Sequence, residues 1–390
     1  MIHPLIKVIT NKMPRRTLGL MSGTSADGLD IAYCEVNLLD RSLRNLAAAT
    51  APYPGELREK VLELANSAAV SLEELSATSH ALGRFYAGAV VEFCRTHQLA
   101  REQIDLIGSH GQTVRHLSQP RTVAGFETRA TLQIGEAEYL AKATRVVTVS
   151  DFRSADLAVG GSGAPLAPIY HALRFSERRL TKAVVNIGGI ANVTILKRDG
   201  EVLATDTGPG NCLIDTLMRS ACGRNYDAGG AVAATGAVHD ALLAELLRSE
   251  FVTRSLPMSL DRREMAKLLE AEPVKALIKE LKPEDSAATL TEFTAVTIRR
   301  QTQRLCRDES PSLVLVCGGG AHNVTLRKRL QEHFAPARVG LTTEFGSNVD
   351  FVEAETFAYL ANLAIEGEEG NLPQVTGAAR RAVLGKISLP

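Results

Sequence analysis

Hydrophobic and polar positions alternate between two patterns along this chain, short apolar runs and longer stretches with helical spacing. The apolar runs predict buried strands at residues 17–21, 31–36, 104–107, 145–150, 182–187, 193–196, 203–205 and 313–316. Helical spacing predicts helices at residues 54–65, 72–98, 212–221, 238–248, 261–271, 287–307 and 355–366. Because strands and helices alternate throughout, the fold class is α/β.

Most of the predicted strands end in polar turns that contain glycine. The first hairpin turn spans residues 23–28, and a second hairpin in the other half of the chain turns at residues 188–192. Residues 108–113 and 151–153 also follow strands and are predicted to be turns. Turns of this kind present ligand groups in α/β folds.

The length of 390 residues favours two lobes rather than one core. We expect lobe I at residues 17–155, with about 365–390 returning to it, and lobe II at residues 156–364. Residues 1–16 are expected to be a disordered extension, since their apolar patch is shorter than the roughly 7 to 15 residues of a signal-peptide core.

Charge and cysteine content narrow the classes of partner. Lysine plus arginine equals aspartate plus glutamate at 44 each, so no global basic field favours nucleic acid or an anionic membrane. No stretch approaches the roughly 20 apolar residues of a membrane span. The six cysteines are irregularly spaced, which predicts reduced thiols rather than zinc ligands or disulfides. We expect a cytoplasmic protein, and a homodimer is one option for its oligomeric state.

The first hairpin turn is a candidate phosphate-binding loop. Two glycines, two hydroxyls and a carboxylate lie between its strands, so successive N–H groups could hold phosphate oxygens. The candidate nucleotide-binding residues of this region are Gly23, Thr24, Ser25, Ala26, Asp27, Gly28, Leu29 and Asp30. Asp27 or Asp30 could hold Mg²⁺ through water, and Asp27 is our metal candidate. The residues are equally compatible with a tight hairpin built of common turn formers.

Two further glycine clusters, both in the second half, are candidates for nucleotide contact. Gly318, Gly319 and Gly320 follow a predicted buried strand and precede a helix, where backbone amides and the helix dipole favour an anion. Close packing of helix against strand explains a glycine triplet equally well. Gly188 and Gly189, between two strands, are a weaker signal of the same kind.

Taken together, the two glycine hairpins and the late triplet resemble the layout of the actin, heat-shock-chaperone and hexokinase superfamily. That resemblance implies two actin-like (ribonuclease H-like) lobes with mixed sheets, flanking helices and an ATP cleft between them. More narrowly, the chain resembles the anhydro-N-acetylmuramic acid kinase family from about Leu18 to Val383. The motifs are GLMSGTSADGLD at 19–30, SHGQT at 109–113, DFR at 151–153, GGSGAPL at 160–166, NIGGIAN at 186–192, DTGPGN at 206–211 and CGGGA at 317–321.

The resemblance implies an unusual kinase reaction. Water attacks the anomeric carbon of 1,6-anhydro-N-acetylmuramic acid, the bridge opens, and the freed 6-oxygen takes the γ-phosphate of MgATP, in the recycling of cell-wall peptidoglycan. By the same resemblance Asp206 is the base that takes the proton from water, and Gly208 and Gly210 beside it belong to the nucleotide site. Thr113 and Glu353 match sugar-contacting positions. Asp151 and Asp156 are further candidates for sugar contact, although Asp156 is equally compatible with a turn residue.

Two departures from the family pattern leave alternatives open. Many members carry an arginine where this chain has Ala155, which admits a neutral anhydro sugar such as levoglucosan. The family's Ser-Thr-Gly-Arg-Glu segment is altered to Ser259-Leu260-Asp261-Arg262-Arg263-Glu264, and we expect neither change to touch Asp206 or the phosphate loops. A sensor that binds nucleotide or sugar without chemistry is the non-enzymatic alternative.

Overall fold

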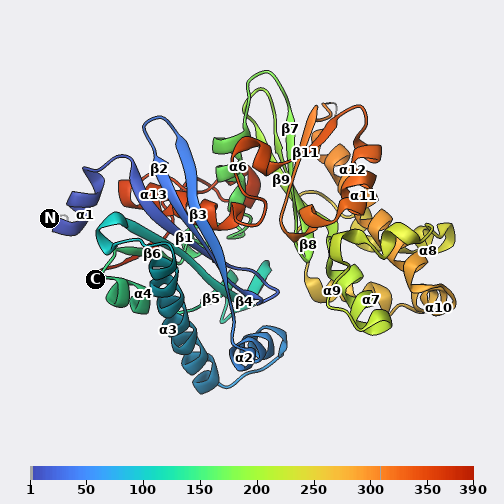
Figure 1. Cartoon of the computed structure of the whole chain (residues 1–390), viewed down its shortest axis with the longest axis horizontal. Helices are drawn as coiled ribbons and strands as arrows, with labels where there is room; N and C mark the ends of the chain where they lie inside the picture. Colours follow the sequence, from blue (N-terminus) through green and yellow to red (C-terminus); the bar gives the residue numbers. More distant parts are fainter. Residues whose placement is uncertain (1–2, 308) are drawn as a thin grey trace. The chain divides into compact units, whose positions relative to one another are not determined.

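The computed structural model describes residues 3–307 and 309–390, apart from the side chains of Ser118, Arg262 and Arg263. The chain forms two compact units, unit 1 (Met1–Arg174 with Phe351–Pro390) and unit 2 (Phe175–Asp350) (Figure 1). The boundaries differ from the predicted 155/156 and about 365. Residues 156–174 stay with unit 1 because Tyr170 donates a hydrogen bond to buried Glu355, at 2.8 Å.

Unit 1 is built on a mixed sheet whose strands lie in the order β12-β6-β4-β1-β2-β3, with β5 paired to β4. The strands are β1 (Arg15–Ser22), β2 (Gly28–Asn37), β3 (Ser42–Pro52), β4 (Leu106–Val123), β5 (Phe126–Ile134), β6 (Thr148–Ser150) and β12 (Lys386–Ser388). β1, β2 and β3 are antiparallel neighbours, whereas β4 runs parallel to β1 and β6 runs parallel to β4.

The helices of unit 1 cover both faces of this sheet. They are α1 (Pro4–Thr10), α2 (Gly55–Asn66), α3 (Leu72–Thr96), α4 (Glu138–Thr144), α5 (Ser154–Ala158), α6 (Ala167–Phe175, whose last residue belongs to unit 2), α13 (Val352–Glu366) and α14 (Pro373–Thr376). Leu18 and Leu20 of β1 join a core cluster with Leu82 and Tyr86 of α3. Gly19, between those two leucines, faces α13 instead, because side chains alternate along a strand.

Glycines in the central strands set how closely α13 approaches the sheet. A Cβ on Gly19 would lie 1.9 Å from the carbonyl oxygen of Ala354, and one on Gly108 of β4 would lie 2.1 Å from that of Phe357. Only glycine permits such an approach. The first turn of α13, which carries Glu353, is therefore held close to β1 and β4.

The predicted disordered extension is wrong for the described part of residues 1–16; residues 1–2 lie outside the described residues. Residues 4–10 form α1, and β1 begins at Arg15. Arg15 is fully buried, and its Nε donates to the carbonyl of Ile9 at 2.8 Å while its guanidinium also pairs with Glu366. Burying this cation requires these partners, which tie the preceding residues to unit 1.

Unit 2 repeats the strand arrangement of unit 1. Its sheet has the order β11-β10-β7-β8-β9, from β7 (Lys182–Ile187), β8 (Ile190–Leu196), β9 (Val202–Pro209), β10 (Leu313–Cys317) and β11 (Arg338–Leu341). β7, β8 and β9 are antiparallel neighbours, and β10 runs parallel to β7, as β4 does to β1. The path β3-β2-β1-β4-β6 of unit 1 thus matches the path β9-β8-β7-β10-β11 of unit 2, with β5 and β12 as additions in unit 1. This is the ribonuclease H-like pattern expected of actin-like lobes.

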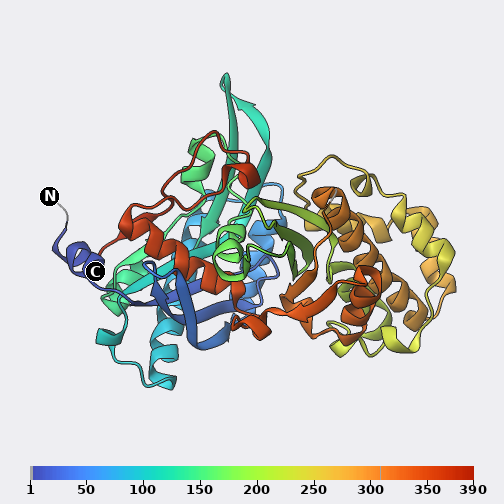
Figure 2. The same cartoon turned by 90° about the horizontal axis from the view of Figure 1, so that it is seen from above.

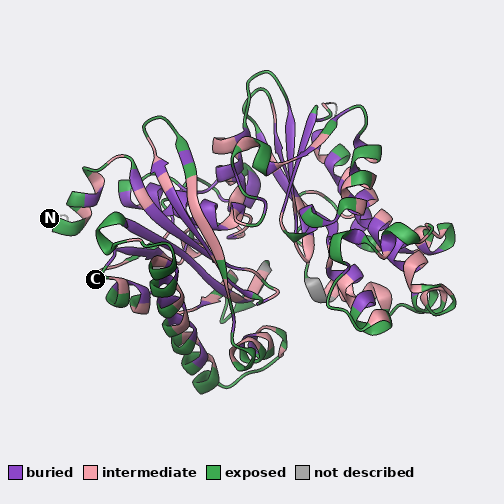
Figure 3. Ribbon diagram, in the orientation of Figure 1, coloured by how far each residue is buried: buried purple, intermediate pink, exposed green. Residues whose placement is uncertain are grey.

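Helices also flank the second sheet. They are α7 (Cys212–Cys222), α8 (Asp240–Leu247), α9 (Arg262–Ala266), α10 (Glu272–Glu280), α11 (Pro283–Cys306) and α12 (Val324–Phe334). α11 and α7 supply much of a second core cluster, including Phe293, Leu290, Leu217 and Met218. Figure 3 shows the strands of both sheets largely buried and the outer helix faces exposed.

One local prediction fails at the fourth strand of unit 1. Residues 108–113 were expected to form a turn, but β4 continues through them to Val123 and pairs with β5 in a long hairpin (Figure 2). The backbone of these residues hydrogen-bonds to β1 on one side and to β5 on the other. This pairing with other strands outweighs the local preference of the residues for a turn.

Two further expectations concern cysteines and membrane spans. All six cysteines lie within the described residues and are free. Among the helices that the structure describes, none combines the length and apolar character needed to cross a bilayer.

Candidate functional site

The phosphate loop of unit 1, residues 23–27 between β1 and β2, is open at its glycine end. A Cβ on Gly23 would find no atom nearer than Ser25 Oγ at 3.9 Å, and Thr24 and Asp27 are exposed. Ala26, with φ of 51°, is buried and donates its N–H to the carbonyl of Gly23 at 3.1 Å. Gly28 is glycine for packing, since its Cβ would lie 2.5 Å from the carbonyl oxygen of Ala51. The loop is both tightly folded and accessible.

The carboxylates of this hairpin have partners within unit 1. Asp27 forms an exposed ion pair with Arg58, at 3.0 Å, and Asp30 accepts a hydrogen bond from Thr50 Oγ1 at 2.5 Å. In the part of the chain that the structure describes, no group of three or more His, Cys, Asp or Glu side chains is arranged to hold a metal.

Thr113 lies beside the phosphate loop, because the register pairs Ser22 of β1 with Gln112 of β4. Gln133 Nε2 donates to Thr113 Oγ1 at 3.0 Å, which leaves the hydroxyl its own proton to donate. The side chain is partly exposed, so a ligand hydroxyl can reach it.

A partly buried cation, Arg153, lies in the same unit. Arg153 Nε donates to His110 Nε2 at 2.9 Å, and His110 Nδ1 lies 2.8 Å from the carbonyl of Gly111. Since Arg can only donate, His110 carries its proton on Nδ1. Burial, and secondarily the charge of Arg153, hold the pKa of His110 well below its usual value, so the ring is neutral and supports Arg153 as a hydrogen-bond acceptor.

Glu353 lies in the first turn of α13 and is partly exposed. Burial raises its pKa above the usual value, the charge of Asp30 adds to this, and the charge of Arg153 opposes it. Burial lowers the pKa of Arg153 to about 10, against the raising effects of Glu353 and Asp156. Glu353, Asp30 and Arg153 thus form one electrostatic group in unit 1.

Asp156 is not placed to contact a ligand, which corrects its prediction as a sugar-contacting residue. It is fully buried, and its Oδ1 accepts hydrogen bonds from Asn371 Nδ2 and Thr376 Oγ1, both at 2.7 Å. Its Oδ2 accepts from the Gly163 N–H at 2.8 Å. A carboxylate saturated in this way holds the glycine-rich segment 160–163 against the C-terminal segment.

Asp151 is also occupied by protein partners. It accepts a hydrogen bond from Ser154 Oγ at 2.5 Å and forms an ion pair with Lys386 at 2.6 Å. The side chain is partly exposed, and its contact with sugar stays a prediction.

Asp206 of β9 is a carboxylate of unit 2 whose pKa departs clearly from its usual value. Burial raises its pKa to about 7, against the lowering effect of a hydrogen bond from the Leu260 N–H to Oδ2, at 2.7 Å. The side chain nevertheless remains partly exposed. A reachable carboxylate with a pKa near neutrality suits a general base.

The segment before α9 holds Asp206 in place. The Asp206 N–H donates to the Met258 carbonyl at 3.1 Å, and the Met258 N–H donates to Thr205 Oγ1 at 2.9 Å. Leu260 belongs to the segment that departs from the family pattern, so the expectation that this departure does not touch Asp206 is wrong. The contact uses a backbone amide, which a change of side chain preserves.

The glycine turns of unit 2 gather at one edge of its sheet, because β7, β9 and β10 run in the same direction and end there. The N–H groups of Gly210 and Asn211 donate to the carbonyls of Gly189 and Gly188 at 2.9 and 2.8 Å. Asn211 is the N-cap residue of α7, so the helix N-terminus lies at this edge too. These amides fix the two turns against each other, and the N-terminus of α7 is the feature of this edge that favours a phosphate group.

Two glycines of the triplet at 318–320 are required by close packing, and the third is accessible. A Cβ on Gly318 would lie 2.3 Å from Asn186 Oδ1, and one on Gly320 would lie 2.3 Å from Ile187 Cγ2. Close packing therefore explains these two. Gly319 is open, with its nearest neighbour 3.8 Å away, and Gly188 likewise meets nothing closer than 3.6 Å. The structure thus leaves Gly319 and Gly188 as the accessible members.

Sequence reasoning missed three groups that act on candidate site residues: the Leu260 amide on Asp206, the buried Gln112 side chain on the Thr113 carbonyl, and the charge of Arg153 on Glu353. Gln112 and Arg153 lie in the SHGQT and DFR motifs, so their place there was the available signal. Nothing in the sequence marks the Leu260 amide.

Two units of one strand order, each with a glycine turn after its first strand, define the class of the protein: an actin-like α/β protein with two ribonuclease H-like units. The model of the family described as anhydro-N-acetylmuramic acid kinase matches residues 15–390, and the chain belongs to that family. The resemblance predicted from the motifs is confirmed.

Curated relatives agree along nearly their whole length. An anhydro-N-acetylmuramic acid kinase of Saccharophagus degradans is 38% identical over 97% of this chain and 100% of its own. One from Pseudomonas syringae pv. syringae is 41% identical over 95% and 98%, respectively. One from Caldanaerobacter subterraneus subsp. tengcongensis is 38% identical over 98% of each chain.

Solved structures are more distant. Component A of the (R)-2-hydroxyglutaryl-CoA dehydratase of Acidaminococcus fermentans aligns with 90% of this chain and 99% of its own. Its 12% identity and TM-score of 0.45 are too low to carry an inference.

Proposed function

We propose that this protein is an ATP-dependent kinase that opens 1,6-anhydro-N-acetylmuramic acid with water and phosphorylates its 6-oxygen. The products are N-acetylmuramic acid 6-phosphate and ADP, and the role is recycling of cell-wall peptidoglycan. Family membership along nearly the whole chain supports the substrate and the donor.

The observation that carries the chemistry is the raised pKa of Asp206, about 7, on a partly exposed carboxylate. Asp206 takes a proton from water while the water oxygen bonds to the anomeric carbon. The bond from that carbon to the bridging 6-oxygen breaks, and the freed oxygen bonds to the γ-phosphorus as ADP leaves. A base with a pKa near the working pH combines the ionised form with adequate proton affinity.

Each unit offers backbone amides for nucleotide binding. In unit 1 we assign the phosphate loop together with Leu29 and Asp30, and in unit 2 we assign the accessible Gly188 and Gly319. Gly208, Gly210, Gly318 and Gly320 shape the turns around them. Phosphoryl transfer depends mainly on such positioning and charge stabilisation.

Mg²⁺ fits these residues as an ion held chiefly by nucleotide phosphates. Mg²⁺ usually takes one or two carboxylates and keeps several waters, which suits exposed Asp27 acting through water, with Asp30 nearby in the chain. When bound, the ion neutralises charge on the transferring phosphoryl group.

Thr113 and Glu353 are the proposed sugar contacts in unit 1. Thr113 retains a hydroxyl proton to donate. Glu353 is partly exposed at the start of α13, where burial raises its pKa and favours a hydrogen-bonding role toward a sugar hydroxyl or amide.

The direct test is turnover of purified protein with MgATP and 1,6-anhydro-N-acetylmuramic acid, followed by ADP release and by mass spectrometry of the sugar. We expect a phosphorylated sugar carrying one oxygen from ¹⁸O-water at the anomeric carbon. Nucleotide and sugar binding without turnover would instead identify a sensor, and no binding of either would refute the proposal.

Ala155 favours a second candidate substrate, a neutral anhydro sugar of the levoglucosan type. The residue lies in α5 and presents no cation to a lactyl carboxylate. Comparing kcat/KM for the two sugars separates the candidates, and we expect anhydro-N-acetylmuramic acid to be preferred.

We also propose that the protein acts in the cytoplasm, where ATP and recycled sugars are both present, and that it forms a homodimer. Light scattering on the purified chain tests the oligomeric state.

A further inference from the structure

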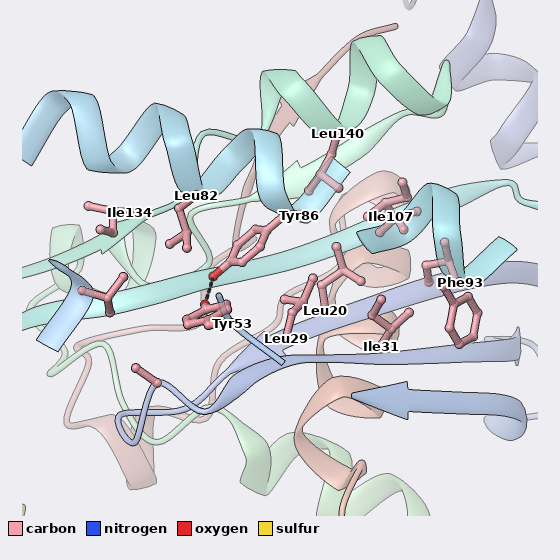
Figure 4. Close-up of a cluster of buried hydrophobic side chains, with 14 of the residues drawn as sticks. Leu20, Leu29, Ile31, Tyr53, Leu82, Tyr86, Phe93, Ile107, Ile134 and Leu140 are labelled. Atoms are coloured by element: carbon pink, nitrogen blue, oxygen red, sulfur yellow. Dashed lines mark hydrogen bonds between the residues drawn. The ribbon is translucent and has the colours of Figure 1, made fainter. Parts of the chain in front are cut away.

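A chain of buried hydrogen bonds crosses the core of unit 1 and ends at its phosphate loop. Tyr86 and Tyr53 lie with their hydroxyl oxygens 2.8 Å apart (Figure 4). The Tyr53 hydroxyl lies 2.8 Å from Ser22 Oγ, which lies 2.7 Å from Gln112 Oε1. Gln112 Nε2 lies 3.1 Å from the carbonyl oxygen of Gly23 and 3.2 Å from that of Thr113.

The direction of these hydrogen bonds follows from the Gln112 amide group, where the series ends. Carbonyl oxygens accept only, so the Gln112 amide nitrogen donates to Gly23 and Thr113, and its oxygen must face Ser22. Ser22 therefore donates to Gln112, with the Gly28 carbonyl at 2.9 Å as a second acceptor. Tyr53 donates to Ser22 and lies 3.3 Å from Gln112 Oε1, and Tyr86 donates to Tyr53. Burial raises the pKa of Tyr53 to about 12 and that of Tyr86 well above its usual value, so both hydroxyls keep their protons.

Gln112 thus joins two segments with different proposed ligands. Gly23 opens the phosphate loop, and Thr113 is the proposed sugar contact. We propose that Gln112 is a positioning residue that couples nucleotide binding at the phosphate loop to sugar binding at Thr113. This inference rests on the proposed function for the identity of the two ligands.

The coupling follows from burial. Gln112 and Ser22 are each 1% exposed, so water cannot replace a hydrogen bond lost when one loop shifts. Both carbonyls are held by one amide group, whose orientation Ser22 fixes. A ligand that selects one position of the phosphate loop therefore selects a position of Thr113, and linkage requires the converse.

Calorimetry on the full chain tests this coupling. The sugar probe is 1,6-anhydro-N-acetylmuramic acid, titrated with and without a non-hydrolysable ATP analogue and Mg²⁺. We expect the analogue to tighten sugar binding roughly 5-fold or more in the wild type, the lower end of usual couplings. In Gln112→Met, which keeps the side-chain length and removes both donors, we expect less than about 2-fold.

Tyr86→Phe is the matched control, because it also loses a buried hydrogen bond but leaves the Ser22–Gln112 bridge intact. We expect it to lower the melting temperature as Gln112→Met does and to keep the coupling. Retained coupling in Gln112→Met, or equal loss in both variants, would overturn the inference. A wild type that binds both ligands independently would overturn it too, whereas a wild type that binds neither refutes the proposed function.

Hydrogen exchange on the wild type decides the question if Gln112→Met does not fold. Sugar alone should slow exchange of the amides of residues 23–27. Unchanged exchange with saturating sugar would overturn the coupling.

Discussion

The backbone N–H of Leu260 donates to Asp206 Oδ2 at 2.7 Å, and this bond fixes one oxygen of the proposed base. Because a hydrogen bond to the ionised form lowers a pKa, it limits the rise that burial causes. The balance leaves a pKa of about 7, where the base is ionised in a large fraction of molecules at neutral pH. The predictions that concern Asp206 follow from this balance.

Asp206→Asn should abolish proton transfer while preserving the local fold, since Asn Oδ1 can still accept from Leu260. We expect kcat to fall by at least roughly 10² to 10⁴, with the affinity for a non-hydrolysable ATP analogue little changed. Coupled ADP detection and calorimetry measure the two quantities. Near-normal turnover in this variant would remove Asp206 from the mechanism.

The pH dependence of turnover should report the same group. Asp206 acts in its ionised form, so log kcat/KM should fall with unit slope as pH drops below about 7 and level off above it. The residual rate of Asp206→Asn should lack this limb. A wild-type profile that is flat between pH 5 and 8 would contradict the assignment.

The contribution of Asp206 to the free energy of unfolding should fall as pH rises, whereas turnover should increase. The folded-state pKa of about 7 lies above the usual 3.8, so Asp206 stabilises the fold at low pH, and this is lost as pH rises to about 7. Asn does not ionise, so Asp206→Asn should gain stability relative to wild type between pH 5.5 and 8. The gain is at most on the order of 2 kcal/mol, because the side chain is partly exposed. Thermal melts at both pH values measure it, and a pH-independent difference would contradict the raised pKa.

The sequence predicted those features that depend on neighbouring residues and missed those that depend on contacts between residues far apart in the chain. The apolar runs predicted the bounds of β7 and β10 to within one residue. Both strands are buried on both faces, so their own residues form a continuous apolar run that marks them. The bounds of β4 and the fold of residues 4–10 were missed, since long-range pairing and the burial of Arg15 decide them. For Asp206, the sequence supplied the residue through a family motif. Its pKa depends on Leu260, which lies 54 positions away and acts through its backbone.

Asp156 should prove structural rather than sugar-binding. Asp156→Ala removes a buried acceptor that serves donors of Asn371, Thr376 and Gly163, so we expect a loss of about 2 kcal/mol of unfolding free energy. The KM for sugar should change less than about 3-fold at a temperature where the variant is folded. Denaturant unfolding and steady-state kinetics provide the readouts. A stable variant with a greatly raised KM would restore the original prediction.

Gly108→Ala should displace α13 and, with it, Glu353. The new Cβ would lie 2.1 Å from the carbonyl oxygen of Phe357, which is backbone and cannot rotate away. Overpacking of this kind costs roughly 1–3 kcal/mol, and we expect a raised KM for sugar in addition. Gly88→Ala in α3 is the control, because a Cβ there meets nothing within 4 Å and should stabilise the helix by up to about 1 kcal/mol. Denaturant unfolding of both variants, with sugar titrations, measures the effects. If Gly108→Ala matched the control in stability and in KM, the close approach of α13 would not position Glu353.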